Sequence, residues 1–145
     1  MNTQLYKRIE LIDCSENYVV FLMGIVIHKP FNIFARQLMK RSLNAVLEEL
    51  EQKKPAGFLT QLHAIGNPSL LVSYWKDLES LLEYARDKSS KHFPAWYEFN
   101  ETISNTKAVG LWHEIYRLSA GSYSGTYRNC PLTGLAKYAP TNRLG

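Results

Sequence analysis

Two ionisable residues stand side by side within the apolar stretch GLWHEIY, residues 110–116, and their types allow either metal binding or proton transfer. A helical HExxH zinc site needs a second histidine four positions after the first, and this chain has Arg117 there, so the motif is absent. The stretch has the apolar and aromatic composition of a β-strand, where adjacent side chains point to opposite faces of the sheet. We therefore expect His113 and Glu114 to serve different surfaces, unless a β-bulge brings them together.

His113 would occupy the same strand face as Val109, Leu111, Ile115 and Arg117. On this mostly apolar face it is either a core histidine held by one hydrogen bond or a residue of a ligand pocket. An imidazole in a pocket could abstract a proton near neutral pH or hold a substrate oxygen. The residues alone leave both interpretations open.

Glu114 would occupy the opposite face, together with Gly110, Trp112 and Tyr116. A carboxylate buried there needs a partner, and Arg117 points the other way. The partner must therefore come from another strand or from a second subunit. We favour a structural glutamate in a dimer interface, because such interfaces often bury paired charges.

A second histidine, His92, precedes a helical segment that begins near Pro94. Trp96 and Phe99 share one face of that segment, and His92 projects to the same side, four positions before Trp96. Because the segment should pack over the sheet face that carries His113, the two histidines would meet in an apolar cleft with few polar groups. The sequence therefore predicts a site for a small apolar molecule.

The composition is that of a single ordinary domain, with 145 residues of which 46% are hydrophobic and 21% charged. The net charge of +4 comes from scattered lysines and arginines, which argues against nucleic acid as a partner. The longest apolar run, residues 18–27, is about half the ~20 residues of a spanning helix, so we expect no membrane partner. Cys14 and Cys130 lack metal spacing and no signal peptide is present, so we expect free thiols in a cytoplasmic protein. The sequence has no metal-binding motif, phosphate-binding glycine loop, dinucleotide fingerprint or Ser/His/Asp pattern.

Hydrophobic periodicity predicts the elements that position these residues. They are a strand at 18–27, a helix over about 33–52, a hairpin turning at 66–68, a helix capped by Asp77, a helical piece from about 94, a strand at 108–118 and a short strand in YSGTYRNC. The order β-α-β-β-α-β, with an extra terminal strand, is that of a ferredoxin-like α+β sandwich. We assign 1–145 to one domain with its core at about 17–131 and less regular ends at 1–16 and 132–145.

The strand at 18–27 is apolar on both of its alternating faces. A sheet does not leave its second face both apolar and wet. A second copy of the chain is the expected cover, so the sequence predicts a homodimer in which two sheets close face to face into an α+β barrel.

The predicted helix at 33–52 carries Arg36, Lys40 and Arg41 near its start and glutamates near its end. The helix dipole favours the reverse arrangement. Either these charges lie on a solvated face, where each costs a few tenths of a kcal/mol, or the basic residues form a rim over a ligand entrance.

Five segments carry a resemblance to a known family: VVFLMGIVIHKP, YWKDLESLLEYA, HFPAW with the Phe99-Asn100 that follows, VGLWHEIY and YRNCPLTGL. Together they span roughly residues 18–135. The chain resembles the small family grouped with the fumagillin-pathway monooxygenase, within the antibiotic-biosynthesis-monooxygenase-like dimeric α+β barrels. It departs from the family at Cys130, where a methionine is expected before Pro131 and where a thiol could enlarge or polarise the pocket wall.

The resemblance implies a homodimer with a pocket between sheet and helices. Many relatives oxidise aromatic or polyketide-like substrates without metal or flavin, whereas others hold haem, degrade haem or only bind ligands. We therefore expect a small monooxygenase-like oxidoreductase, without a cofactor, that acts on an apolar or aromatic molecule. His113 and His92 would be catalytic, orienting or deprotonating the substrate so that its carbanion reacts with oxygen. The expected substrate-binding residues are Trp96, Phe99, Trp112, Tyr116 and Tyr74.

Two alternatives belong to other functional classes. One is a haem protein on the same barrel, a dehydratase or lyase, with His92 or His113 as axial ligand and a Soret band in its spectrum. The other is a non-catalytic ligand-binding dimer, which would keep its affinity when both histidines are removed.

Overall fold

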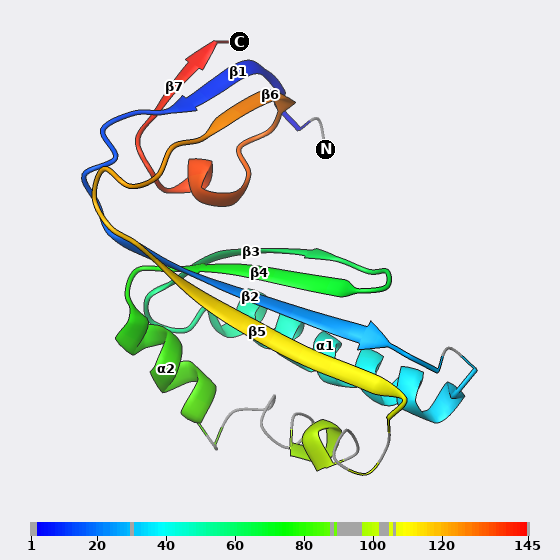
Figure 1. The fold of residues 1–145 in the computed structure, drawn as a ribbon. Helices are drawn as coiled ribbons and strands as arrows, with labels where there is room; N and C mark the ends of the chain where they lie inside the picture. The colour runs from blue at the N-terminus through cyan, green and yellow to red at the C-terminus, as the bar shows by residue number, and fades with distance from the viewer. Residues whose placement is uncertain are drawn as a thin grey trace.

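The computed structural model describes residues 3–29, 31–87, 89, 97–101, 105 and 107–144 of the chain (Figure 1). Its elements are β1 (Tyr6–Leu11), β2 (Tyr18–Ile27), α1 (Ile33–Lys53), β3 (Phe58–Ala64), β4 (Ser69–Trp75), α2 (Leu78–Arg86), β5 (Val109–Leu118), β6 (Thr126–Cys130), the short 3-10 helix η1 (Gly134–Lys137) and β7 (Thr141–Leu144). Residues 97–101 are also helical.

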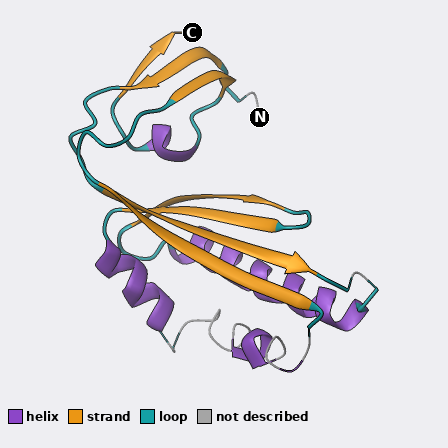
Figure 2. Cartoon of the chain, in the orientation of Figure 1, coloured by secondary structure: helices purple, strands orange, loops and turns teal. Residues whose placement is uncertain are grey.

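Four strands form an antiparallel sheet in the order β3-β4-β2-β5. Helices α1 and α2 both lie against one face of this sheet (Figure 2). The chain therefore runs β-α-β-β-α-β through the sheet, with β2 in the first place and β5 in the last. The predicted ferredoxin-like α+β fold is confirmed.

Side-chain caps set where both helices begin. The Asn32 side-chain oxygen accepts a hydrogen bond from the Ala35 backbone N–H at 3.0 Å, so α1 starts directly after it. The predicted cap of α2 is confirmed, because the Asp77 carboxylate accepts from the Ser80 N–H at 2.8 Å. This hydrogen bond holds the pKa of Asp77 below its usual range.

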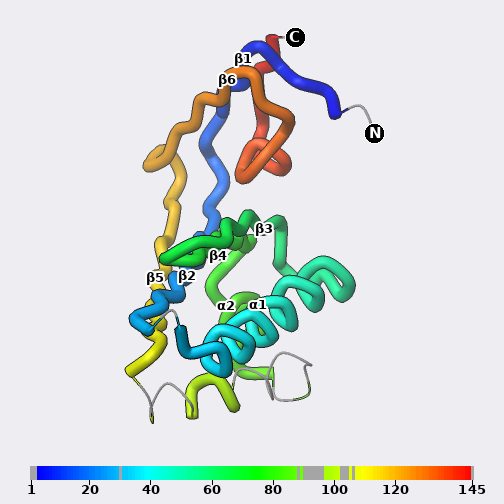
Figure 3. Tube along the Cα trace, turned by 90° about the vertical axis from the view of Figure 1, so that its right-hand side faces the viewer, coloured from blue at the N-terminus to red at the C-terminus, as the bar shows by residue number. Residues whose placement is uncertain are grey.

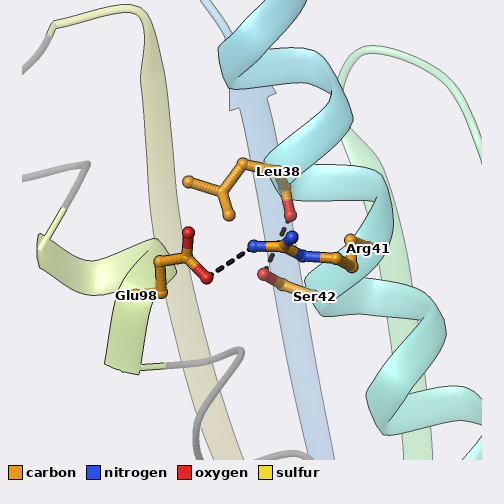
Figure 4. A network of polar contacts seen from close by, with 4 residues as sticks. All are labelled: Leu38, Arg41, Ser42 and Glu98. Carbon is orange, nitrogen blue, oxygen red and sulfur yellow. Dashed lines mark hydrogen bonds and ion pairs between the residues drawn. The ribbon is translucent and has the colours of Figure 1, made fainter.

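The main core lies between the sheet and α1, as the helical spacing of apolar residues predicts. Residues of α1 that are buried there are Ala35, Leu38, Met39, Ser42, Leu43, Val46, Glu49 and Leu50. The one buried hydroxyl in this set, that of Ser42, donates to the Leu38 carbonyl at 2.9 Å within the helix (Figure 4). Since the hydroxyl bonds within its own helix, it needs no partner from the sheet.

The two ends of the chain form a second, three-stranded sheet in the order β6-β1-β7. The prediction of less regular ends is therefore wrong for β1 and β7, and the extra strand β6 pairs with β1 and not with the larger sheet. In β1 the alternation is weak, because the exposed Lys7 lies on the same strand face as the fully buried Ile9. A pairing partner more than a hundred residues away completes this strand, and local sequence does not reveal it.

The small sheet lies on the side of the four-stranded sheet that faces away from the helices (Figures 1 and 3). Its contact is a cluster around Leu135 and Ala139, which pack with Tyr18 and Tyr74 of the larger sheet. Part of the apolar second face is thus covered by the chain itself. No helix among the described residues is long and apolar enough to cross a membrane.

Candidate functional site

An apolar cavity of about 280 Å³ lies between the four-stranded sheet and the helices. Its lining comes from three strands, two helices and the helical segment at 97–101. The lining residues are Phe21, Met23, Val46, Leu50, Leu71, Ser73, Trp75, Leu81, Leu82, Tyr84, Ala85, Asn100, Leu111, His113 and Ile115. Larger hollows of about 620 and 590 Å³ are grooves along α2 and along α1, and two further hollows of about 390 and 590 Å³ join α1 to α2 and α1 to the β3–β4 hairpin at the surface, without a histidine among the described residues that line them. The apolar cavity is where separate elements converge, as ligand sites require.

His113 lines this cavity from β5, together with Leu111 and Ile115. The alternation predicted for the strand is thus confirmed on this face. The imidazole stacks on the ring of Phe21 in the neighbouring strand, with 5.6 Å between the ring centroids. Its side chain is exposed, so the ring sits at the open side of the cavity and is accessible to protons from solvent.

Three further polar side chains reach the cavity: Ser73, Tyr84 and Asn100. The Ser73 hydroxyl is buried and accepts a hydrogen bond from the Trp75 indole N–H at 2.9 Å. This bond fixes the indole of Trp75, which belongs to both the core and the cavity wall. The cavity therefore combines apolar walls with a small number of hydrogen-bonding groups.

Tyr84 joins the cavity to a buried carboxylate of α1. Its ring packs against Trp75 at 5.5 Å between centroids. Burial, followed by the charge of Glu49 and a hydrogen bond to it, raises the pKa of the Tyr84 hydroxyl far above its usual range. Glu49 is itself buried and has the Lys53 ammonium 3.6 Å from its carboxylate. Tyr84 is therefore a neutral hydroxyl at every physiological pH.

The other face of β5 carries Trp112, Glu114 and Tyr116, and none of them lines the cavity. Trp112 lies across Gly24 of the adjacent strand, where an added side chain would collide with the indole. Tyr116 donates a hydrogen bond to the Glu114 carboxylate, and this bond raises the pKa of Tyr116. Trp112 and Tyr116 were expected to contact the substrate, but strand alternation places them away from His113.

Two more expected site residues lie elsewhere. Tyr74 packs on the small sheet, in the cluster with Leu135. Phe99 is buried in the main core, with 1% of its surface exposed, and is not among the residues that line the cavity. Cys130 ends β6 in the small sheet, so it does not form the pocket wall for which a thiol was expected. His92 and Trp96 lie outside the described residues.

The helical segment at 97–101 is tied to α1 by an ion pair between Glu98 and Arg41 (Figure 4). This contact brings Asn100 to the cavity, and it gives one of the basic residues near the start of α1 a structural partner.

Among the described residues, no group of three or more histidine, cysteine or acidic side chains could hold a metal ion.

Sequence reasoning missed Ser73, Tyr84 and Asn100. Tyr84 lies three positions after Leu81, and helical spacing puts the two side chains on one face, so this spacing was a usable signal. Asn100 was noticed only as part of a motif. Ser73 gave no signal, because a serine within an apolar strand is most often a tolerated small residue.

Comparisons with known proteins agree with this architecture. Residues 18–135 match the family described as Monooxygenase af470-like. Monooxygenase af470 of Aspergillus fumigatus is 29% identical over 121 residues, which cover 77% of this chain and 42% of that protein. The chain therefore spans less than half the length of this curated relative.

Among solved structures, an aldoxime dehydratase superposes on 97% of this chain and 45% of its own, with a TM-score of 0.73 and 20% identity. The aldoxime dehydratase OxdRE, in complex with butyraldoxime, superposes on 93% of this chain and 41% of its own, with a TM-score of 0.72 and 18% identity. At these identities the superpositions show a shared fold.

Proposed function

The chain belongs to the Monooxygenase af470-like family, and from this membership and the cavity we propose that it is a cofactor-independent oxidoreductase for an apolar or aromatic small molecule. One observation carries the proposal: the His113 imidazole lies at the open side of a mostly apolar cavity between sheet and helices. To form a carbanion that reacts with oxygen, a site needs at least a base in apolar surroundings. We extend the role of base to His92 as well, on the sequence alone.

The reaction class is the conversion of an activated CH₂ group to a carbonyl. His113 removes one proton from the CH₂, and the carbanion transfers its electrons to O₂, so that a C–O bond forms. The resulting peroxide takes up the proton, then loses water as the second C–H bond breaks. The balance is R₂CH₂ + O₂ → R₂C=O + H₂O, and the substrate itself supplies all four electrons.

The cavity suits this chemistry because its lining is mostly apolar, so a substrate that fills it would displace water from the His113 imidazole. A carbanion in contact with bulk water would be reprotonated before it met oxygen. Phe21 and Trp75 offer aromatic surfaces against which a planar substrate can stack. The Ser73 hydroxyl accepts from the Trp75 indole and keeps its own proton, with which it can hold a substrate oxygen.

We further propose that the protein works as a homodimer. The sheet face opposite the helices presents half-buried apolar side chains from neighbouring strands, among them Val20, Leu22 and Val72. The small sheet covers the part near Tyr74, and a second copy is the simplest cover for the rest. The region that the curated relative shares with this chain is less than half of that protein, so the rest of its length has room for a second unit of this size in one polypeptide.

The haem alternative fits the described residues poorly. Among them, His113 is the one histidine that lines the cavity, and no lysine or arginine in the lining could pair with the propionates. The volume of about 280 Å³ lies just below the ~300–1,000 Å³ of pockets for drug-sized molecules, and haem is larger than most of these. A Soret band in the purified protein would revive this alternative.

The experiment that tests the function uses anthrone, a flat apolar ketone whose CH₂ is acidified by the ring system. We expect the protein to accelerate oxygen uptake by anthrone, to be insensitive to metal chelators, and to show no absorbance in the visible range. Binding of anthrone without oxygen uptake would favour the non-catalytic ligand-binding dimer. Loss of activity on chelation would contradict cofactor independence.

A further inference from the structure

One end of the molecule exposes large apolar side chains on two separate segments. Phe31 is 95% exposed and Ile33 and Phe34 are 68% and 66% exposed where α1 begins, while Ile65 is 75% exposed where the β3–β4 hairpin turns. We refer to Phe31, Ile33, Phe34 and Ile65 as the apolar tip. They are the four most exposed large apolar side chains among the described residues, and their gathering at one end marks an interaction surface.

The two segments of the apolar tip are held together by Asn67 in the hairpin. The Asn67 side-chain oxygen accepts from the Ile27 N–H at 2.9 Å, and its NH₂ donates to the Ile27 carbonyl at 3.0 Å. These bonds fix the hairpin to the end of β2, just before α1 begins (Figure 1). Ile33 of α1 and Ile65 of the hairpin both line one groove of about 590 Å³. The two segments of the apolar tip are therefore held in a fixed arrangement and form one surface.

Basic side chains surround the apolar tip. Lys29, Arg36 and Lys40 are exposed, and the last two line the same groove as Ile33 and Ile65. The segments that build this end contain no aspartate or glutamate, since none occurs in residues 17–47 or 52–76. The two segments of the apolar tip therefore carry a net positive charge, and Glu98 of the neighbouring helical segment is paired with Arg41, so this end favours an anionic partner.

We propose that the apolar tip docks the protein on an anionic lipid surface. Stable attachment to a bilayer needs two signals, and this end has both: apolar side chains that enter the interfacial region and basic side chains that pair with anionic headgroups. The expectation of no membrane partner rested on the lack of a spanning segment, and peripheral docking needs none.

The shape of the tip favours a bilayer over an acidic protein. Phe31 on a turn and Ile65 on a hairpin project into solvent, with 95% and 75% of their surface exposed. A protein partner would have to present a matching set of concave apolar pockets with acidic rims. Lipids rearrange around projecting side chains, so a bilayer needs no such match.

The test measures co-sedimentation of the full chain with vesicles of phosphatidylcholine alone and of phosphatidylcholine mixed equally with phosphatidylserine. We expect binding to the mixed vesicles that weakens with added salt. Phe31→Ser and Ile65→Ser should each weaken it about tenfold or more, since each removes a large apolar side chain. Lys40→Gln should weaken it on the order of fivefold, the typical effect of one basic residue near such a surface.

The matched controls make the same kinds of substitution at positions away from the apolar tip. Leu5→Ser removes an exposed apolar residue of the small-sheet end, and Lys54→Gln removes a lysine beyond the far end of α1. Both should bind within about twofold of the parent chain, and all variants should give the parent's circular dichroism.

Three results would overturn the proposal. One is the absence of co-sedimentation with mixed vesicles, and another is equal loss of binding in the control and tip variants. The third is retention on immobilised polyglutamate, lost in the Phe31 and Ile65 variants, without vesicle binding. That result would assign the tip to an acidic polypeptide instead.

Discussion

At the scale of single residues, His113 and Glu114 are neighbours in sequence with separate surroundings. His113 stacks on Phe21 and lines the apolar cavity, whereas Glu114 accepts a hydrogen bond from Tyr116 on the other face of β5. No bulge interrupts the pairing of β5 with β2 along this stretch. The two side chains therefore act on different parts of the molecule.

The separation predicts nearly additive effects on stability. His113→Gln and Glu114→Gln should each change the free energy of unfolding, and the double variant should show their sum within about 0.5 kcal/mol. We expect Glu114→Gln to lower dimer affinity or stability and to affect catalysis little. The measurement is urea unfolding of the four proteins in one double-mutant cycle. A coupling well above that limit would show that the two side chains share one site.

Tyr84 predicts a pH dependence of stability in the alkaline range. Burial, and then Glu49, raises its pKa in the folded protein above the ordinary value near 10. Below pH ~10 both states keep the proton, so Tyr84 contributes no slope there. Above pH ~10 the unfolded state loses a proton that the folded state retains, so the free energy of unfolding falls as pH rises.

The variant that checks this is Tyr84→Phe. Above pH ~10 the free energy of unfolding of the parent chain should fall more steeply with pH than that of the variant. The difference between the two slopes is at most about 1.4 kcal/mol per pH unit, and it stays below this limit because Tyr84 is partly exposed. Urea unfolding at several alkaline pH values measures both slopes. Parallel slopes would mean that Tyr84 ionises in the folded state as readily as in the unfolded one.

At the scale of elements, the pairing of β2 with β5 depends on Gly24. The Trp112 indole occupies the place where a side chain at position 24 would lie. Gly24→Ala should therefore destabilise the protein by about 1–3 kcal/mol, the usual cost of overpacking. In a Trp112→Leu background the same substitution should cost less, because the smaller side chain leaves room.

Gly66→Ala is the matched control for this prediction. An added side chain there meets only the Pro68 carbonyl at 3.6 Å, an ordinary contact. Thermal or urea unfolding should place this variant within about 0.5 kcal/mol of the parent chain. Equal costs of Gly24→Ala with and without Trp112 would remove the indole as the cause.

Local sequence signals predicted the elements that make up the cavity. The Asp77 cap, the apolar stripe of α1 and the alternation of β5 each depend on residues close in sequence, and all three are confirmed. The pairing of β1 with β6 and β7 joins the two ends of the chain, and no local pattern encodes it. Alternation within β5 was enough to place His113 on the cavity face. The other cavity residues, from α2 and at Asn100, meet His113 only through contacts between distant parts of the chain, which no local pattern predicts.

At the scale of the whole molecule, we predict a homodimer that forms through the sheet face opposite the helices. Sedimentation equilibrium at micromolar concentration should give twice the chain mass of 16.7 kDa. Val72→Glu places a charge on this face and should shift the equilibrium toward monomer, whereas Gln37→Glu on the exposed face of α1 should not. Circular dichroism confirms that both variants fold. A parent chain that sediments as a monomer would contradict the dimer.

The central claim is that His113 starts an oxygen-dependent reaction in the apolar cavity. The most direct measurement is the incorporation of ¹⁸O from ¹⁸O₂ into the carbonyl formed from anthrone, compared between His113→Gln and the control His63→Gln. His63 is an exposed histidine of β3 whose ring bonds to Gln61 and lies outside the cavity. We predict one labelled oxygen per product molecule, a rate reduced ~10²- to 10⁴-fold in His113→Gln, and an unchanged rate in His63→Gln. Product without label, or equal rates in the two variants, would contradict the claim.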